Sequence, residues 1–447
     1  MSSETESVAI IGAGWAGLAA AVELCRHNYR VSVFDSSPQT GGRARSIEWN
    51  GITLDNGQHL MIGAYQQMLS LLDLLEADVP SLFKRLPHQM LMLDAKTGHS
   101  VFDLQLPSFP APLHLLGGIL RTPQLSLMEK FQVLIRFNRL LNAPLKQDLS
   151  VDKWLASANL PQKYIKNVLE PVCLAALTTH PWQASAKAFQ SVLQQTFNAP
   201  AEHTDLLIPT IDLGQTIPAL AEKFIVNHGG QIYTRSKVKQ LFTENNQLSS
   251  LSVNEQTLSF DQYILATPPS GTVKLLENIE ATQSLCTQLQ SLVYEPVTTL
   301  YLMFSRPVKL PAVMTGFVNG ITEWVFERSV SGHPEILAIV ISAHGEHLNI
   351  SHEQLKDQIL SELKQAIPEL PQLQSSKLII EKRATFQCHP DVDQFRPGIK
   401  TPLSNLNLCG DYVYIEENNQ PGLPSTLEGA LRSGVKCAQT VIKRLND

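Results

Sequence analysis

The pattern of apolar and polar residues near the start of the chain predicts a strand, a helix and a second strand. Residues 8–11 form an unbroken apolar run, which is typical of a buried parallel strand, and residues 18–26 have the periodicity of a helix. A second strand is predicted over residues 30–34. This order predicts a βαβ unit, in which both strands end at the same edge of a parallel sheet.

Two later parts of the chain continue this pattern. One face of a predicted helix carries the apolar side chains of Ile217, Leu220, Ala221 and Phe224. The elements expected after this helix are a turn and strand over 229–241, part of a hairpin at 254–260 and a buried strand at 263–267. Towards the end of the chain, the sequence predicts a strand at 406–409 and a helix at 425–445.

We therefore expect an α/β fold with a Rossmann-like domain assembled from the discontinuous segments 1–65, 205–270 and 395–447. The segments between them, 66–204 and 271–394, are expected to form an α+β substrate domain. The first of these is predicted to be mostly helical, and apolar runs within 293–304 and 323–342 predict a sheet in the second. Since doubly wound sheets bind ligands at the carboxyl ends of their strands, all three nucleotide-binding segments are expected to meet at one site.

Composition narrows the class of protein. The 447 residues are enough for two or three domains, and a formal net charge of −6 argues against a general nucleic-acid binder. Six cysteines without a C-x-x-C pair indicate neither a disulfide framework nor a metal site, so a reducing compartment is expected. The acidic, polar start does not resemble a signal peptide, and no apolar run reaches about 18 residues. We therefore expect a cytoplasmic protein.

The loop between the first strand and helix carries candidate phosphate-binding residues. Gly12, Gly14 and Gly17 have G-x-G-x-x-G spacing, and Ala16 lies within the same loop. In this motif the first glycine permits a tight turn, the second lets backbone approach a pyrophosphate, and the third lets helix and strand pack closely. Asp35, eighteen residues after Gly17, ends the second strand, where a ribose hydroxyl needs an acceptor. An ordinary βαβ turn with a solvated Asp35 is the alternative.

A second glycine-rich loop, GGRAR, indicates which dinucleotide is bound. Gly41 and Gly42 allow close backbone approach, and Arg43 offers a fork of donors to phosphate. This loop resembles the extended fingerprint of FAD-dependent amine oxidases and phytoene desaturases, which implies FAD as the cofactor. The alternative is a glycine-rich turn with surface arginines.

The same resemblance implies further contacts to FAD. It places the turn DNGQHL beside the flavin ring, where Gly57 permits close approach and Gln58 and His59 offer hydrogen bonds. For His59, a structural bond to backbone is an equally open interpretation. The resemblance also implies that Val238 holds the adenine through its backbone amide and carbonyl.

The C-terminal motifs complete this expected site. Gly410 and Asp411 resemble the element whose carboxylate binds the ribitol chain, and the helix that follows would begin at the flavin with Ser425, Thr426 and Leu427. A helix N-terminus stabilises the negative charge of a reduced flavin. Ser425 and Glu428 also have the spacing of a capping box.

Taken together, four segments resemble the squalene-associated FAD-dependent desaturases: GWAGLAAAVEL, GGRARSIEWNGITLDNGQHLMIGAY, DLLIPTIDL and GLPSTLEGALRSG. The resemblance implies a hydroxysqualene dehydroxylase, in which an allylic hydroxyl leaves and hydride from reduced flavin replaces it. The departing hydroxyl needs a proton, and His59 is our candidate donor. One departure is the connection YVYIEENNQPG, which is longer than in the family. It is expected to form a surface bulge at Glu416, Glu417, Asn418 and Asn419, and the alternative is that it alters the mouth of the site.

The hydrophobic isoprenoid substrate that the resemblance implies is barely soluble, so peripheral contact with the inner face of the cytoplasmic membrane is expected. The candidate segment is 112–141, where one helical side is expected to contain Leu127, Met128, Phe131, Leu134, Ile135 and Leu141. Cations in the same segment that would face lipid phosphates are Lys130, Arg136 and Arg139. A core helix of the substrate domain has the same periodicity and is the alternative.

Three other functions stay open at this point. A carotenoid-type desaturase or isomerase would share every flavin motif. A flavin amine oxidase would favour an aromatic cage, for which Tyr412 and Tyr414 are weak candidates. A non-catalytic flavoprotein would bind an isoprenoid for a partner enzyme.

Overall fold

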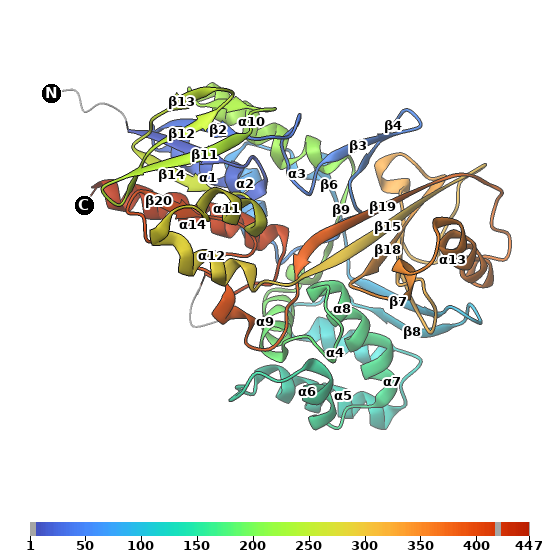
Figure 1. The fold of residues 1–447 in the computed structure, drawn as a ribbon. Helices are drawn as coiled ribbons and strands as arrows, with labels where there is room; N and C mark the ends of the chain where they lie inside the picture. Colours follow the sequence, from blue (N-terminus) through green and yellow to red (C-terminus); the bar gives the residue numbers. More distant parts are fainter. Residues whose placement is uncertain (1–5, 416–421, 447) are drawn as a thin grey trace.

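A five-stranded parallel sheet organises the nucleotide-binding part of the molecule (Figure 1). The computed structural model describes residues 6–415 and 422–446. From edge to edge the strands are β10 (Gln231–Tyr233), β2 (Arg30–Phe34), β1 (Ser7–Ile11), β14 (Gln262–Leu265) and β20 (Leu406–Leu408). Ile10 lies opposite Val33 on one side and Ile264 on the other. The sheet thus takes strands from three separate parts of the sequence, as a Rossmann-like α/β fold requires.

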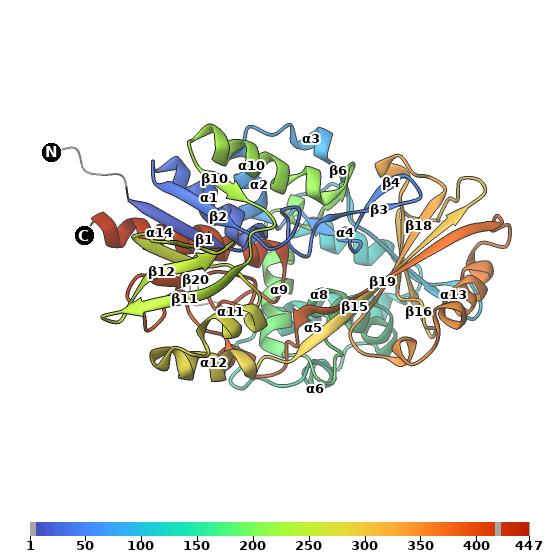
Figure 2. The same ribbon diagram turned by 45° about the horizontal axis from the view of Figure 1, so that its top comes forward.

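Helices cover one face of this sheet. They are α1 (Trp15–Arg26), α10 (Ile217–Asn227) and α14 (Leu427–Asn446), and α1 packs against both of the others. The apolar residues beneath them include Val8, Ile10 and Ile264, which share one hydrophobic cluster with α1 and α14. The opposite face, with Ala9 and Tyr263, packs against an antiparallel sheet. Its strands are β11 (Val238–Glu244), β12 (Gln247–Val253) and β13 (Gln256–Leu258), seen below the parallel sheet in Figure 2.

A seven-stranded mixed sheet forms the core of the second part of the molecule. Its order is β19-β15-β18-β17-β16-β7-β8. The strands are β7 (Gln89–Asp94), β8 (Ser100–Gln105), β15 (Tyr294–Phe304), β16 (Met314–Val318), β17 (Trp324–Glu327), β18 (Ile336–Ser342) and β19 (Leu373–Phe386). Helix α13 (His352–Ala366) covers one face through Leu355, Ile359 and Leu363.

Short helices form the rest of this second part. They are α4 (Leu113–Arg121), α5 (Leu127–Asn142), α6 (Val151–Ser157), α7 (Gln162–Tyr164), α8 (Glu170–Leu177) and α9 (Ala186–Phe197). Smaller elements connect the two parts, namely β3 (Ser46–Trp49), β4 (Ile52–Asp55), β5 (Met61–Ile62), α2 (Gln66–Leu74), α3 (Val79–Leu82), β6 (Phe83–Leu86), β9 (Leu206–Pro209), α11 (Pro269–Leu276) and α12 (Gln283–Gln290). None of the described helices is long and apolar enough to cross a membrane.

Two expectations about secondary structure were wrong in part. The segment 66–204 is helical from 113 to 197, but residues 83–105 form strands that pair into two sheets. The segment 229–241 is two strands of different sheets, because the chain turns at Arg235, which has a positive φ of 51°. The amide of Ser236 then bonds the carbonyl of Asp35, which holds this turn against the end of β2.

Candidate cofactor site

The three glycines after β1 meet different steric demands. A Cβ on Gly12 would lie 2.6 Å from the carbonyl oxygen of Ala266, and Gly12 also has a positive φ of 113°. A Cβ on Gly17 would lie 2.0 Å from the carbonyl oxygen of Gly12. Gly14 is different, since the nearest atom to its added Cβ would be the Cα of Gly42, 4.0 Å away. Packing within the protein therefore requires glycine at positions 12 and 17, whereas at position 14 the protein itself leaves open space beside the backbone.

The two glycine-rich loops lie side by side. The amide of Gly41 donates to the carbonyl of Ala13 at 2.9 Å, and Gly14 forms an isolated bridge with Gly41. Gly42 has a positive φ of 64°, and its Cβ position is 3.1 Å from the Cα of Gly14. Ala16 lies in the buried first turn of α1. The fold thus brings together the two motifs that the sequence pointed to separately.

Asp35 lies at the carboxyl end of β2, beside the glycine loop. One carboxylate oxygen accepts the amide of Ala13 at 2.6 Å and the other accepts the amide of Ser37 at 2.7 Å. A carboxylate oxygen accepts more than one hydrogen bond, so both keep capacity for ribose hydroxyls. Val238 is buried at the start of β11, and the segment leading to it is bonded to Asp35 through Ser236.

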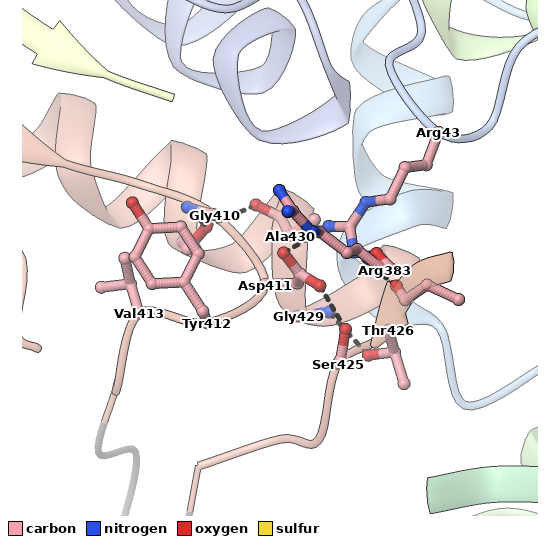
Figure 3. Close-up of polar contacts among 12 residues, drawn as sticks. Arg43, Arg383, Gly410, Asp411, Tyr412, Val413, Ser425, Thr426, Gly429 and Ala430 are labelled. Atoms are coloured by element: carbon pink, nitrogen blue, oxygen red, sulfur yellow. Dashed lines mark hydrogen bonds and ion pairs between the residues drawn. The ribbon is translucent and has the colours of Figure 1, made fainter. Parts of the chain in front are cut away.

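Asp411 joins two other predicted site residues (Figure 3). Arg43 donates from Nη2 to its Oδ1 at 2.6 Å, and the hydroxyl of Ser425 donates to its Oδ2. Arg43 also donates from Nη1 to the carbonyl of Ala384. Burial lowers the pKa of Arg43 and the negative charge of Asp411 raises it, and the net direction is upward. Protein acceptors thus hold the guanidinium in place at this site.

Helix α14 begins with a different cap from the one expected. The hydroxyl of Thr426 accepts the amide of Gly429 at 3.0 Å, so Thr426 is the N-cap and Leu427 the first helical residue. Gly410, which has a positive φ of 152°, donates its amide to the hydroxyl of Ser433 within the same helix. These bonds fix the start of α14 against the end of β20.

The predicted capping box of Ser425 and Glu428 is wrong, because both side chains bind residues elsewhere. Ser425 donates to Asp411, as described above. Glu428, only 2% exposed, accepts the amides of Gln67 and Met68 at 2.8 and 3.0 Å in the first turn of α2. A carboxylate at a helix N-terminus is stabilising, so Glu428 ties α14 to α2.

A buried ion pair lies under the turn DNGQHL. Asp55 is fully buried, and its Oδ2 is 3.2 Å from Nη1 of Arg328, which is 4% exposed. The same Nη1 donates to Oε1 of Gln58 at 2.8 Å, and the amide of Leu213 donates to Oδ1 of Asp55 at 2.7 Å. Arg328 follows β17, far away in the sequence, and no motif around it signals this role. It connects the second sheet to the turn expected beside the flavin.

His59 is held by its own loop. Its Nδ1 bonds the carbonyl of Gly57 at 2.7 Å, so Nδ1 carries the hydrogen and Nε2 of the neutral ring is an acceptor. Burial lowers the pKa of His59, although the charge of Asp55 opposes this effect. A Cβ on Gly57 would be 3.5 Å from Oγ1 of Thr299, an ordinary contact on β15. A proton-donor role would require the charged ring, which this environment disfavours.

The aromatic residues after Asp411 do not form a cage. Tyr412 is 1% exposed, and its hydroxyl lies 3.2 Å from that of Thr272 in the core. The ring of Tyr414 lies 5.7 Å from the guanidinium carbon of Arg396. The expected surface bulge at 416–419 lies outside the described residues.

A parallel sheet with two adjoining glycine loops at its carboxyl edge is typical of dinucleotide-binding proteins. The family of flavin-containing amine oxidoreductases matches residues 15–442, and the chain belongs to that family. Its cofactor is FAD, and the space at Gly14 and the acceptor capacity of Asp35 fit a dinucleotide.

Several known proteins are similar along nearly the whole chain. Hydroxysqualene dehydroxylase of Sinorhizobium fredii is 25% identical, with 99% of each chain covered, and that of Rhodopseudomonas palustris is 26% identical, with 98% of this chain and 99% of the other covered. Zeta-carotene desaturase of Synechocystis is 23% identical, with 97% of each covered. An oxidoreductase structure from Methanosarcina mazei has a TM-score of 0.73 at 18% identity, covering 98% of this chain and all (100%) of the other. Putrescine oxidase bound to putrescine has a TM-score of 0.71 at 15% identity, covering 98% and 99%. The structural likenesses show the shared fold.

Proposed function

We propose that this flavoprotein catalyses the reductive dehydroxylation of hydroxysqualene to squalene. The observation that carries the proposal is that three relatives named hydroxysqualene dehydroxylase align over 97–99% of this chain at 24–26% identity. The turn DNGQHL and the segment DLLIPTIDL, which resemble that family, also contact one another, since Asp55 accepts the amide of Leu213, the last residue of that segment.

The proposed cofactor residues come from the two glycine-rich loops, the end of β2, the turn after β4, the start of β11 and the segment from β20 to α14. They are Gly12, Gly14, Ala16, Gly17, Asp35, Gly41, Gly42, Arg43, Gly57, Gln58, Val238, Gly410, Asp411, Ser425, Thr426 and Leu427. In this proposal Asp35 accepts ribose hydroxyls, and the glycine loops admit the pyrophosphate. The amides at the start of α14 favour negative charge next to them.

The net reaction replaces a C–O bond by a C–H bond, which consumes one hydride and one proton and releases water. FAD, when bound and reduced, supplies hydride-transfer chemistry. The protein must exclude water, orient the hydroxyl-bearing carbon and deliver the proton. His59 is our candidate for contact with the hydroxyl. The neutral ring, which burial favours, accepts a hydrogen bond from the hydroxyl at Nε2 and orients it. The less populated charged ring is a stronger acid because burial lowers the pKa of His59, and it donates the proton from Nε2.

The test is anaerobic mixing of the photoreduced, FAD-loaded protein with detergent-dispersed hydroxysqualene. We expect flavin reoxidation with one squalene formed per flavin. The variant His59→Ala should keep its yellow cofactor and lose at least about 100-fold in turnover, the usual contribution of a positioned acid or base. The control is His99→Ala, which changes an exposed histidine.

Two outcomes would overturn these assignments. Formation of a more unsaturated product from a carotenoid precursor by the oxidised protein, without reaction of hydroxysqualene, would establish a desaturase. The similarity to zeta-carotene desaturase is the reason for testing a carotenoid precursor. Unchanged turnover in His59→Ala would remove His59 from the reaction.

A further inference from the structure

The helices α4 and α5 carry large apolar side chains that no other described part of the chain covers. The exposed residues on α5 are 61% to 73% accessible, and those on α4 and in the loop before it are 39% to 50% accessible. Together they are Phe109, Leu113, Leu116, Leu120, Leu127, Met128, Phe131 and Ile135, which we call the apolar face. On each helix the spacing of these residues places them on one side.

The opposite side of α5 is part of the core. Val133, Leu140 and Leu141 are buried, and Leu134 is half-buried against the same hydrophobic cluster. The sequence-based assignment of Leu134 and Leu141 to a lipid-facing side was therefore wrong. The interpretation of α5 as a core helix holds for this side alone, because the other side carries the apolar face.

Specific contacts hold the apolar face together. The side chain of Lys130 donates to the carbonyl of Leu120 at 2.7 Å, which ties α5 to the end of α4. The guanidinium of Arg121 lies 5.8 Å from the centre of the Phe109 ring. A capping box of Ser126 and Glu129 begins α5. In Figure 1, α5 lies with α6 and α7 along the lower edge of the molecule.

The charge of this segment is opposite to that of the whole chain. Residues 107–145 contain the cations Arg121, Lys130, Arg136 and Arg139. Their one acidic residue, Glu129, lies 3.0 Å from the Nζ of Lys163, which compensates it. The net charge of the chain is −6, so the positive charge around the apolar face is local.

We infer that the apolar face docks on the surface of a phospholipid bilayer that contains anionic lipids. A helix with apolar residues on one side and basic residues near its edges lies in the membrane interface. Anionic headgroups attract the four cations, and this attraction weakens as salt increases. The docking surface is argued from exposure and charge alone. The inference rests on the proposed function only for the reason to dock, since a bilayer that dissolves a C30 isoprenoid would present this substrate to the docked enzyme.

The test is flotation of the full-length, FAD-loaded protein with vesicles of phosphatidylcholine and phosphatidylglycerol. The variant Phe131→Ser/Ile135→Ser removes two side chains that are 61% and 68% exposed, so it should unfold at about the same temperature as the wild type. We expect about a tenfold or greater loss of vesicle partitioning, since each side chain would bury its apolar area in the interface. The matched control is Val226→Ser/Val293→Ser, whose side chains are 59% and 56% exposed elsewhere. It should float like the wild type.

Vesicles of pure phosphatidylcholine should bind the wild type more weakly than vesicles that also contain phosphatidylglycerol. Added salt should remove this difference between the two vesicle types. Equal flotation of the wild type and the Phe131→Ser/Ile135→Ser variant would overturn the inference. So would a wild-type dimer in solution that this variant converts to a monomer, because a second copy would then cover the apolar face.

The proposed function is checked separately with detergent-dispersed hydroxysqualene. Phe131→Ser/Ile135→Ser should react like the wild type in detergent and more slowly with vesicle-borne substrate. Flotation without any dehydroxylation would leave the docking surface standing and remove the proposed reaction.

Discussion

At the scale of single residues, the buried pair of Asp55 and Arg328 is the strongest electrostatic feature of the site. Its two charges lie 3.2 Å apart with 0% and 4% of their side chains exposed. Arg328→Met should destabilise the protein by about 3–5 kcal/mol, because the buried Asp55 carboxyl would lose its partner in the interior. The measurement is urea-induced unfolding, followed together with FAD absorbance.

The control for this prediction is the double variant Asp55→Asn/Arg328→Met. It removes both charges, so it should be more stable than Arg328→Met alone. If both variants unfold at the same urea concentration, the ion pair does not hold the DNGQHL turn.

The site residues differ in how far the sequence could predict them, and the Asp55–Arg328 pair shows why. Gly12 and Gly17 belong to a local motif, and each has the steric role that its spacing implied. Asp35 lies beside this loop as its spacing predicts, and its contact with a ribose stays a prediction. Arg328 could not be found in this way, because its partner is 273 residues away and no local spacing records the contact. Glu428 was misassigned for a similar reason, since the amides that it accepts are 360 and 361 residues away.

At the scale of elements, the crossing of α1 and α14 fixes the position of the glycine loop. A Cβ on Gly434 in α14 would lie 2.1 Å from the carbonyl oxygen of Ala16 in α1. Gly434→Ala should therefore push the two helices apart, cost about 1–3 kcal/mol or more of stability, and weaken FAD binding. Gly398→Ala is the control, because no atom lies within 4 Å of its Cβ position and its backbone φ is not positive. Thermal unfolding and FAD titration of both variants check the prediction, and equal FAD affinity in both would contradict it.

The elements themselves were partly predictable. The observed strand Arg30–Phe34 agrees with the predicted strand, in which the apolar residues Val31, Val33 and Phe34 are buried. The segment 229–241 gave no signal that it would divide between two sheets, since the division depends on hydrogen bonds to the end of β2. The strands at 83–105 were missed because their pairing partners include β9 and β16, which come much later in the chain.

At the scale of the whole molecule, FAD should link parts of the chain that are distant in sequence. The parallel sheet contains strands from residues 7–34, 231–265 and 406–408, and the proposed cofactor residues come from the loops beside them. A ligand that binds only the folded state stabilises it by about 2.7 kcal/mol at 100 times its dissociation constant. Removal of FAD should therefore lower the melting temperature, and adding it back should restore the value.

Gly14→Ala separates cofactor binding from folding in this test. Gly14 has an ordinary φ of −75°, and its Cβ would meet only the Cα of Gly42 at 4.0 Å. Without FAD, the Gly14→Ala variant should therefore have a melting temperature close to that of the FAD-free wild type. Added FAD should stabilise the variant little, because the new methyl group occupies the space proposed for the pyrophosphate. Gly12→Ala should instead destabilise the FAD-free protein, since its Cβ would lie 2.6 Å from the carbonyl oxygen of Ala266. If Gly14→Ala gained as much stability from FAD as the wild type, the pyrophosphate could not lie against this loop.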